Sequence, residues 1–394
     1  MMISGRRVSV ALATIVNAAQ VLLLQLLALV SLAPADFGAY SLQYLGFALA
    51  SSLSLSLIVE TWMRLRTGAS ASEQPTWRQF STTLVYFSLS AGFVALVLSL
   101  LLPSLREIAI FGAIAIAAST YRAGSRYHEL VSGHLHRVLV SDLSGLLATG
   151  GVWLTFTIAT SQSSLLTLVI AWAAGSVLSA AIARIPLMGG PRIARRWVLD
   201  HSATIKPLLR DSSLMDLGAI GTPFIVAPVL GIASFGVYRA VSNVAAPVRL
   251  VLNPIRPLLA SRPASFARSK SVVLGAAGAS ASFGIASFFC LWLIGQLQLN
   301  LGVLTDVASY SVPTAIFVAA SFLGHFFYIA ARSHANSRSL MTGRIVQTAL
   351  AVLLPIAGAL LGGLQLAIWG YAIATAISSA TWTALILRAP RELE

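Results

Sequence analysis

The sequence is poor in cysteine, lysine and acidic residues, and each shortage argues against a class of protein. A single cysteine, Cys290, allows neither a disulfide framework nor a thiolate metal cluster. The only lysines are Lys206 and Lys270, and no G-x-x-x-x-G-K-[ST] loop occurs, which argues against a nucleotide-driven pump. No D-x-D and no H-E-x-x-H occurs, so we expect no metal, no cofactor and no enzymatic activity. Three histidines cluster, and we expect interfacial residues rather than a metal site: His128, His134 and His136.

The residues that are present are mostly apolar, and they come in long runs. Hydrophobic residues make up 57% of the chain, charged residues 10%, and the mean hydropathy is +0.85, which no ordinary soluble domain approaches. Runs of about 20 residues can cross the hydrocarbon core of a bilayer. They predict an all-α polytopic membrane protein with about twelve transmembrane helices, near 8–33, 37–60, 82–103, 107–131, 138–160, 164–186, 212–230, 235–260, 271–295, 303–330, 343–362 and 365–387.

A short motif, F-G-x-Y, occurs at Phe37–Tyr40 and again at Phe235–Tyr238. The offset is 235 − 37 = 198 residues, which is close to half of the 394-residue chain. Each copy opens an apolar run just after a short turn. Internal repeats of this length are typical of transporters built from two similar halves. We therefore predict two six-helix halves, 1–186 and 212–394, joined by a linker at 187–211.

The basic residues lie almost entirely between alternate pairs of apolar runs, and this pattern predicts the orientation. By the positive-inside rule, the N- and C-termini are cytoplasmic. The linker 187–211 alternates basic and apolar residues, as does a helix lying on the anionic cytoplasmic leaflet, although a plain connector would also fit. The net charge of +14 therefore indicates contact with anionic membrane lipids and not with nucleic acid.

Three arginines interrupt the apolar run 235–262: Arg239, Arg249 and Arg256. A cation in hydrocarbon costs several kcal/mol, so such a residue normally faces a bundle interior, a water-filled cavity or an interface. Arg249 and Arg256 are seven residues apart and share a helix face. We predict that these arginines, together with Asn243, line a cationic cavity that binds an anion.

Four further charged residues are candidates for roles in transport. Arg122 and Arg126 are one helical turn apart at the inner end of their run, where they form an inner gate or, alternatively, snorkel to the headgroups. Asp216 and Glu60 are candidates for a coupling acid, because ion-coupled transport needs an ionisable group within the membrane. An ordinary ion pair with a nearby arginine would also explain Asp216.

The arrangement of these features resembles the polysaccharide and O-antigen flippase branch of the multidrug/oligosaccharidyl-lipid/polysaccharide (MOP) superfamily. The resemblance rests on the twelve predicted spans in two halves, on P-A-D-F-G-A-Y at 34–40, and on G-V-Y-R-A-V-S-N-V followed by N-P-I-R-P within 236–257. It implies a MATE-like flippase fold in a bacterial inner membrane. It also implies a substrate of the undecaprenyl-pyrophosphate-linked oligosaccharide type, with polysaccharide polymerase and glycosyltransferases as possible partners.

Two other functions fit less well. A cation-coupled multidrug or metabolite antiporter of a related twelve-helix fold would need more buried acids than this chain offers. A membrane-embedded glycan ligase or polymerase usually needs a substantial outer loop to hold its acceptor, whereas the predicted outer loops are only a few residues long. The sequence therefore favours a flippase that carries its cargo from the inner to the outer leaflet by alternating access.

Overall fold

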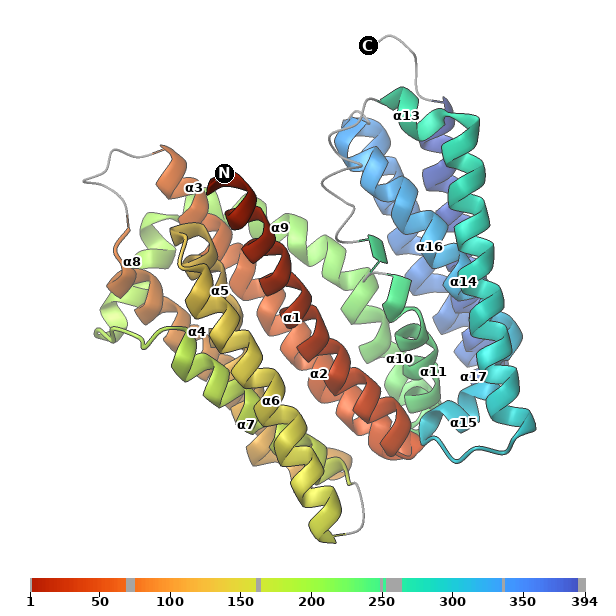
Figure 1. Ribbon diagram of the computed structural model, residues 1–394, viewed down its shortest axis with the longest axis horizontal. Helices are drawn as coiled ribbons and strands as arrows, with labels where there is room; N and C mark the ends of the chain where they lie inside the picture. Colours follow the sequence, from red (N-terminus) through yellow and green to blue (C-terminus); the bar gives the residue numbers. More distant parts are fainter. Residues whose placement is uncertain are drawn as a thin grey trace. The chain divides into compact units, whose positions relative to one another are not determined.

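A computed structural model describes residues 2–68, 75–160, 164–248, 251–252, 264–334 and 337–388. These residues are almost entirely helical and include no strand. Nine of their helices are long and apolar enough to cross a membrane. The chain divides into two compact units (Figure 1).

Unit 1 comprises Met1–Ala28 and Ala39–Asp216. Its helices are all or part of α1 (Met2–Ser31), α2 (Pro34–Ser54), the π-helical η1 (Leu55–Val59), α3 (Glu60–Gly68), α4 (Trp77–Leu101), the 3₁₀ turn η2 (Pro103–Ile108), α5 (Ala109–Ser132), α6 (Leu135–Thr160), α7 (Leu165–Ala183), α8 (Pro191–Asp200) and α9 (Ser202–Asp216). The helices α8 and α9 cover most of the predicted linker, and they belong to this unit.

Small residues bring α6 and α7 close together in unit 1. A side chain at Gly175 would meet the Gly145 carbonyl oxygen at 2.7 Å, so the two backbones approach too closely for a Cβ. The Ser141 hydroxyl on α6 donates to the Ser179 carbonyl on α7 at 2.8 Å. Small residues and buried hydroxyls are typical of helix packing in membranes, where lipid offers apolar contacts as good as those of protein.

Unit 2 comprises Leu29–Gly38 and Leu217–Glu394. Its further elements are η3 (Leu217–Gly221), α10 (Thr222–Leu230), α11 (Ile232–Val244), α13 (Ala264–Arg268), α14 (Lys270–Gln296), α15 (Val303–Ala308), α16 (Ser311–His334) and α17 (Ser337–Arg388). The 52-residue α17 is broken by non-helical dihedral angles at Gly362 and Gly363, and Gly363 has a positive φ of 61°. This break lies where the sequence predicts a turn between two spans, 343–362 and 365–387.

The glycines of the two F-G-x-Y motifs, Gly38 and Gly236, approach each other closely inside unit 2. An ideal Cβ on Gly236 would lie 2.9 Å from the Gly38 nitrogen and still closer to the Pro34 carbonyl oxygen, and one on Gly38 would meet the Ile232 carbonyl. Phe37 and Phe235 are fully buried. The glycines of the motif thus allow two helix backbones to touch, which explains why the end of α1 and the start of α2 cluster with unit 2.

Candidate functional site

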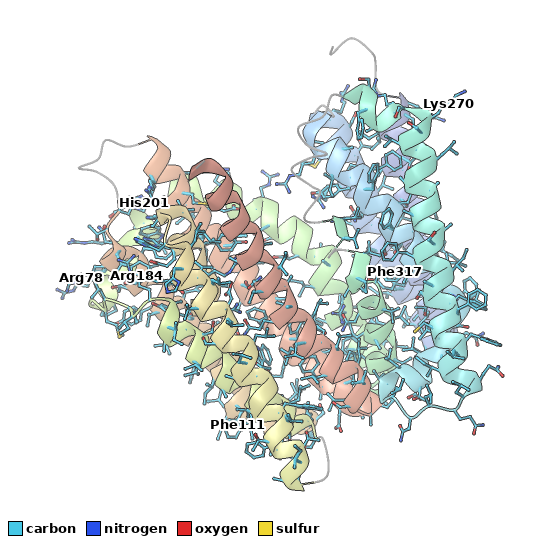
Figure 2. All side chains as sticks on the ribbon, viewed as in Figure 1. Arg78, Phe111, Arg184, His201, Lys270 and Phe317 are labelled. Carbon is cyan, nitrogen blue, oxygen red and sulfur yellow. The ribbon has the colours of Figure 1, made fainter. Side chains whose placement is uncertain are left out.

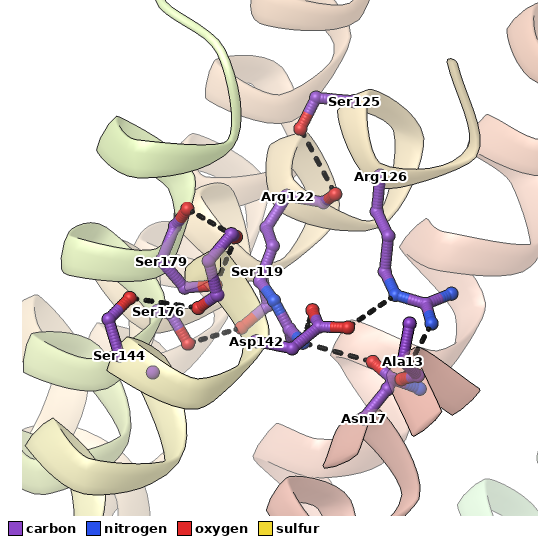
Figure 3. A network of polar contacts seen from close by, with 12 residues as sticks. Ala13, Asn17, Ser119, Arg122, Ser125, Arg126, Asp142, Ser144, Ser176 and Ser179 are labelled. Carbon is purple, nitrogen blue, oxygen red and sulfur yellow. Dashed lines mark hydrogen bonds and ion pairs between the residues drawn. The ribbon is translucent and has the colours of Figure 1, made fainter. Parts of the chain in front are cut away.

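A network of charged side chains links three helices inside unit 1 (Figure 3). The helix α5 ends at Ser132 and is capped by Gly133, which adopts the left-handed conformation with φ 86°; α6 begins two residues after Gly133. Arg122 and Arg126 lie 133 − 122 = 11 and 133 − 126 = 7 residues before this turn, and Asp142 lies 142 − 133 = 9 residues after it. Because helices rise 1.5 Å per residue, the three side chains have similar depths in the bundle.

Asp142 binds both arginines at once. The NH2 nitrogen of Arg122 donates to Oδ1 at 2.7 Å, and Nε of Arg126 donates to Oδ2 at 2.9 Å. The Asp142 side chain is fully buried, and the two arginine side chains are only 11% and 12% exposed. The interpretation that both arginines snorkel toward the headgroups is therefore wrong: a carboxylate holds them inside the bundle.

The same arginines attach α1 to the α5–α6 hairpin. Arg122 NH2 also donates to Asn17 Oδ1 at 2.9 Å, and Arg126 NH2 donates to the Ala13 carbonyl at 3.2 Å. Figure 3 shows these contacts reaching from α5 to the adjacent turns of α1. Asn17 belongs to a polar stripe on α1, and Gln20 on that stripe lies against Gly145 of α6. The network thus holds three helices of the unit together.

The network carries an excess positive charge. Two guanidinium groups face one carboxylate, which leaves a formal charge of +1 on these three side chains. Nε of Arg122 is buried and has no hydrogen-bond partner among the described residues. A buried charge is costly unless it is paired, and a guanidinium with an uncommitted N–H remains able to bind an anion. The arrangement can therefore hold the helices together or form part of an anion-binding site.

A second polar cluster surrounds Glu129 near the C-terminal end of α5. Its fully buried carboxylate accepts from Arg184 NH1 at 2.8 Å and lies 2.8 Å from Nδ1 of His134. The Arg184 guanidinium stacks over Trp77 at 4.2 Å. Nδ1 of His128 is 3.3 Å from the same carboxylate. Two of the three clustered histidines are thus Glu129 partners, and the described residues contain no group of side chains suited to a metal ion.

The other predicted site residues lie on separate elements. Arg239 and Asn243 are one turn apart on α11 in unit 2, where Arg239 is half-buried. Asp216 ends α9 and accepts a hydrogen bond from Ser52. Glu60 begins α3 and is half-buried. Two predicted cavity residues lie outside the described residues: Arg249 and Arg256.

Asp142 and Glu129 are residues of these two clusters that carry no role in the prediction from sequence. A signal for Asp142 was available, because opposite charges at similar distances on either side of a helical turn fall side by side in the folded hairpin. Asn17 shares one side of its predicted helix with Gln20 and Gln25, and this polar stripe predicts either a face toward a cavity or hydrogen bonding between helices. Nothing in the sequence near Glu129 marks it as buried, since its partner Arg184 is 184 − 129 = 55 residues away.

The chain is similar to known proteins in its fold and not in its sequence. No protein-family model and no curated protein matches the chain. Among solved structures, it is similar to an inward-facing multidrug resistance MATE family transporter of the MOP superfamily, with 14% identity, 93% of this chain and 92% of that chain covered, and a TM-score of 0.62. It is similar to the lipid II flippase MurJ in an inward closed conformation, with 10% identity, coverage of 96% and 86%, and a TM-score of 0.64. The chain therefore shares the fold of this transporter and this flippase.

This likeness confirms the predicted all-α membrane architecture and its MATE-like fold. A MATE transporter in an outward-facing conformation also matches, with 12% identity, coverage of 95% and 93%, and a TM-score of 0.53. These solved structures are transporters and a flippase, not enzymes. At such low identity the likeness concerns the fold alone, so the polysaccharide branch, the count of twelve spans and the orientation stay predictions.

Proposed function

We propose that the protein is a membrane flippase that moves a polyprenyl-pyrophosphate-linked oligosaccharide from the inner to the outer leaflet. Arg239, Arg249, Arg256 and Asn243 bind the pyrophosphate in a cationic cavity, and Arg122 and Arg126 form an inner gate. Alternating access moves the headgroup across the membrane while the lipid tail stays in the bilayer. Such a protein serves cell-surface polysaccharide synthesis in a bacterial inner membrane, alongside glycosyltransferases and a polysaccharide polymerase.

The observation that carries this proposal is the charge of the network in unit 1. Two arginines share one buried carboxylate, Asp142, so this network of three side chains holds more positive than negative charge inside unit 1. Pyrophosphate carries at least two negative charges, and guanidinium binds phosphate oxygens in a bidentate manner without losing its proton. Half-buried Arg239 on α11 adds a further cation in unit 2. An anionic headgroup is the cargo whose charge complements these residues.

The MurJ likeness supports a lipid-borne cargo, since that protein is a lipid II flippase. A cation-coupled multidrug antiporter is the second candidate, because several of the similar structures are MATE transporters. In that case Glu60 or Asp216 supplies the coupling acid. The two candidates differ in the charge of the cargo, because a cationic drug is repelled by the arginines that attract a pyrophosphate.

Ligand-dependent thermal stability of the purified protein tests this difference. Undecaprenyl pyrophosphate should raise the Tm, whereas undecaprenol and the lipophilic cation tetraphenylphosphonium should not, because a ligand that binds only the folded state stabilises it by mass action. Arg239→Gln should weaken the shift, and the exposed Arg332→Gln on α16 serves as its matched control. A Tm raised by tetraphenylphosphonium and not by the pyrophosphate would favour the antiporter.

A further inference from the structure

The chain between α7 and α8 is tied firmly to the beginning of α4. The carbonyl of Leu187 accepts hydrogen bonds from the Ser81 and Thr82 hydroxyls at 3.1 and 3.0 Å. The Leu187 and Gly189 amides donate back to the same two hydroxyls at 3.2 and 2.9 Å. This segment, Ile185–Gly189, is called the strap below. Its backbone is fixed by side chains of another helix, although it belongs to no helix itself.

The strap holds its apolar side chains outward. Ile185 is 75% exposed, Leu187 55% and Met188 56%. They follow the last residue of α7, Ala183, and the Arg184 side chain that turns inward to Glu129. Exposed apolar side chains that are grouped together mark a surface that contacts an apolar partner such as a membrane.

The helix α8 continues this surface with positive charge. Arg192, Arg195 and Arg196 are exposed, and Val198 and Leu199 are 45% and 60% exposed. The opposite side of α8 is anchored: Trp197 is 4% exposed, and its indole N–H donates to the Leu57 carbonyl at 3.1 Å. Charged and apolar side chains therefore face outward together from a helix that is docked on the unit.

The same end of unit 1 is basic more widely. Figure 2 shows Arg78, Arg184 and His201 gathered at this end, while Phe111 lies toward the other end of the unit. Arg78 is exposed, and its Nε would lie 3.4 Å from a Cβ on Gly189, beside the strap. Apolar side chains beside arginines are the composition of a segment that sits at the boundary between acyl chains and anionic headgroups.

We infer that the strap and the outer face of α8 form a built-in anchor for anionic phospholipids. Ile185, Leu187 and Met188 enter the edge of the hydrocarbon, and Arg78, Arg192, Arg195 and Arg196 bind headgroup phosphates. The hydrogen bonds to Ser81 and Thr82 make the anchor rigid, so it fixes the height of unit 1 in the membrane. This surface is separate from the proposed cargo site and does not depend on it.

A lipid-facing probe tests the depth of the strap. In a Cys290→Ser background, Met188→Cys is labelled with an environment-sensitive fluorophore, and the full-length protein is placed in nanodiscs of phosphatidylcholine with and without phosphatidylglycerol. Emission should shift to the blue and be quenched by lipids brominated near the headgroup end of the acyl chain. A matched label at exposed Asn300, in the loop between α14 and α15 and outside the anchor, should show less quenching.

The contribution of the arginines on α8 to lipid binding is measured as the change in Tm when phosphatidylglycerol is added. Phosphatidylglycerol should stabilise the protein in detergent, and the variant R192Q/R195Q/R196Q should lose this effect. Each arginine strengthens attraction to an anionic surface about fivefold, so the half-maximal lipid concentration should rise on the order of 100-fold. The control R332Q/R338Q/R388Q, which removes three exposed arginines of unit 2, should keep the effect. Equal stabilisation of both variants, or an unquenched probe at Met188, overturns the proposal and leaves the surface to a protein partner.

Discussion

Replacing Asp142 by asparagine removes the charge that holds the arginine network together while it preserves the shape of the side chain. Arg122 and Arg126 donate to its two oxygens at 2.7 and 2.9 Å, and Asp142 is fully buried. Removing one partner of a buried ion pair costs about 3–5 kcal/mol, because the remaining charge is left without compensation. In Asp142→Asn two like charges remain, so we expect the free energy of unfolding to fall by an amount at the upper end of that range.

Removing Arg126 should cost less. Arg126→Gln leaves the Arg122–Asp142 pair intact and neutral, so the loss should be about 1.5–3 kcal/mol, the value of a hydrogen bond to a charged group. The double variant Asp142→Asn/Arg126→Gln has no Arg126 charge left to stand without a partner. Its free energy of unfolding should therefore fall by less than the sum of the losses in the two single variants. We expect a coupling of about 0.5–3 kcal/mol.

The assay is the midpoint of detergent-induced unfolding followed by circular dichroism, for the wild type, the two single variants and the double variant. Asp306→Asn is the control, because it removes an exposed acid on α15 and should change stability by less than about 0.5 kcal/mol. Wild-type stability in Asp142→Asn would refute the reasoning. Strict additivity of the two single effects would also refute it, because it would mean that the three side chains do not act together.

Three further predictions concern packing, the second cluster and topology. Gly38→Ala should destabilise the protein, because the added Cβ would meet the Ile232 carbonyl. Gly278→Ala is the control: there is open space around Gly278, so alanine should stabilise α14 by about 0.5–1 kcal/mol. Thermal unfolding measures both variants. Glu129→Gln should lower the Tm, because the buried carboxylate binds Arg184 and His134 at 2.8 Å. Cysteine at Ser202 should be protected from an impermeant reagent in intact cells, and cysteine at Ser104 should be labelled.

Each of these predictions has a contrary outcome. A stable Gly38→Ala protein would show that the two F-G-x-Y motifs do not touch. An unchanged Tm in Glu129→Gln would mean that the cluster contributes nothing to stability, with Glu107→Gln, an exposed acid in η2, as the matched control. The labelling experiment needs Cys290→Ser, because the native cysteine is exposed. Labelling at Ser202 in intact cells would reverse the predicted orientation.

The membrane architecture could be predicted from the sequence because run length and apolar composition are local properties. The turn at Gly362 and Gly363 follows from the same pattern. The sequence indicates the close approach of Gly38 to Gly236 only through the repeated F-G-x-Y motif, because a contact between two backbones does not change the hydropathy profile. For this reason the predicted halves give no hint that Leu29–Gly38 clusters with unit 2.

The candidate site could be predicted only in part. The sequence marks Arg122 and Arg126 as unusual, because cations are rare in apolar runs. It does not show which way a helix is rotated, so it left open whether they face lipid or protein. The carboxylate of Asp142 decides that question, and it acts through an inter-helix contact that composition does not encode. The place of Arg239 on α11 agrees with the sequence, but its role in binding stays a prediction.

Transport by the reconstituted protein tests the central claim most directly. Proteoliposomes are loaded with a fluorescent polyprenyl-pyrophosphate disaccharide, and its movement between leaflets is followed by quenching from outside. The wild type should accelerate this movement, and Arg239→Gln/Arg249→Gln should abolish it while the variant still inserts and folds. Lysine at both positions should restore part of the rate, because it keeps the charge but loses the bidentate geometry. Full transport by the double glutamine variant would contradict a cationic site for the pyrophosphate.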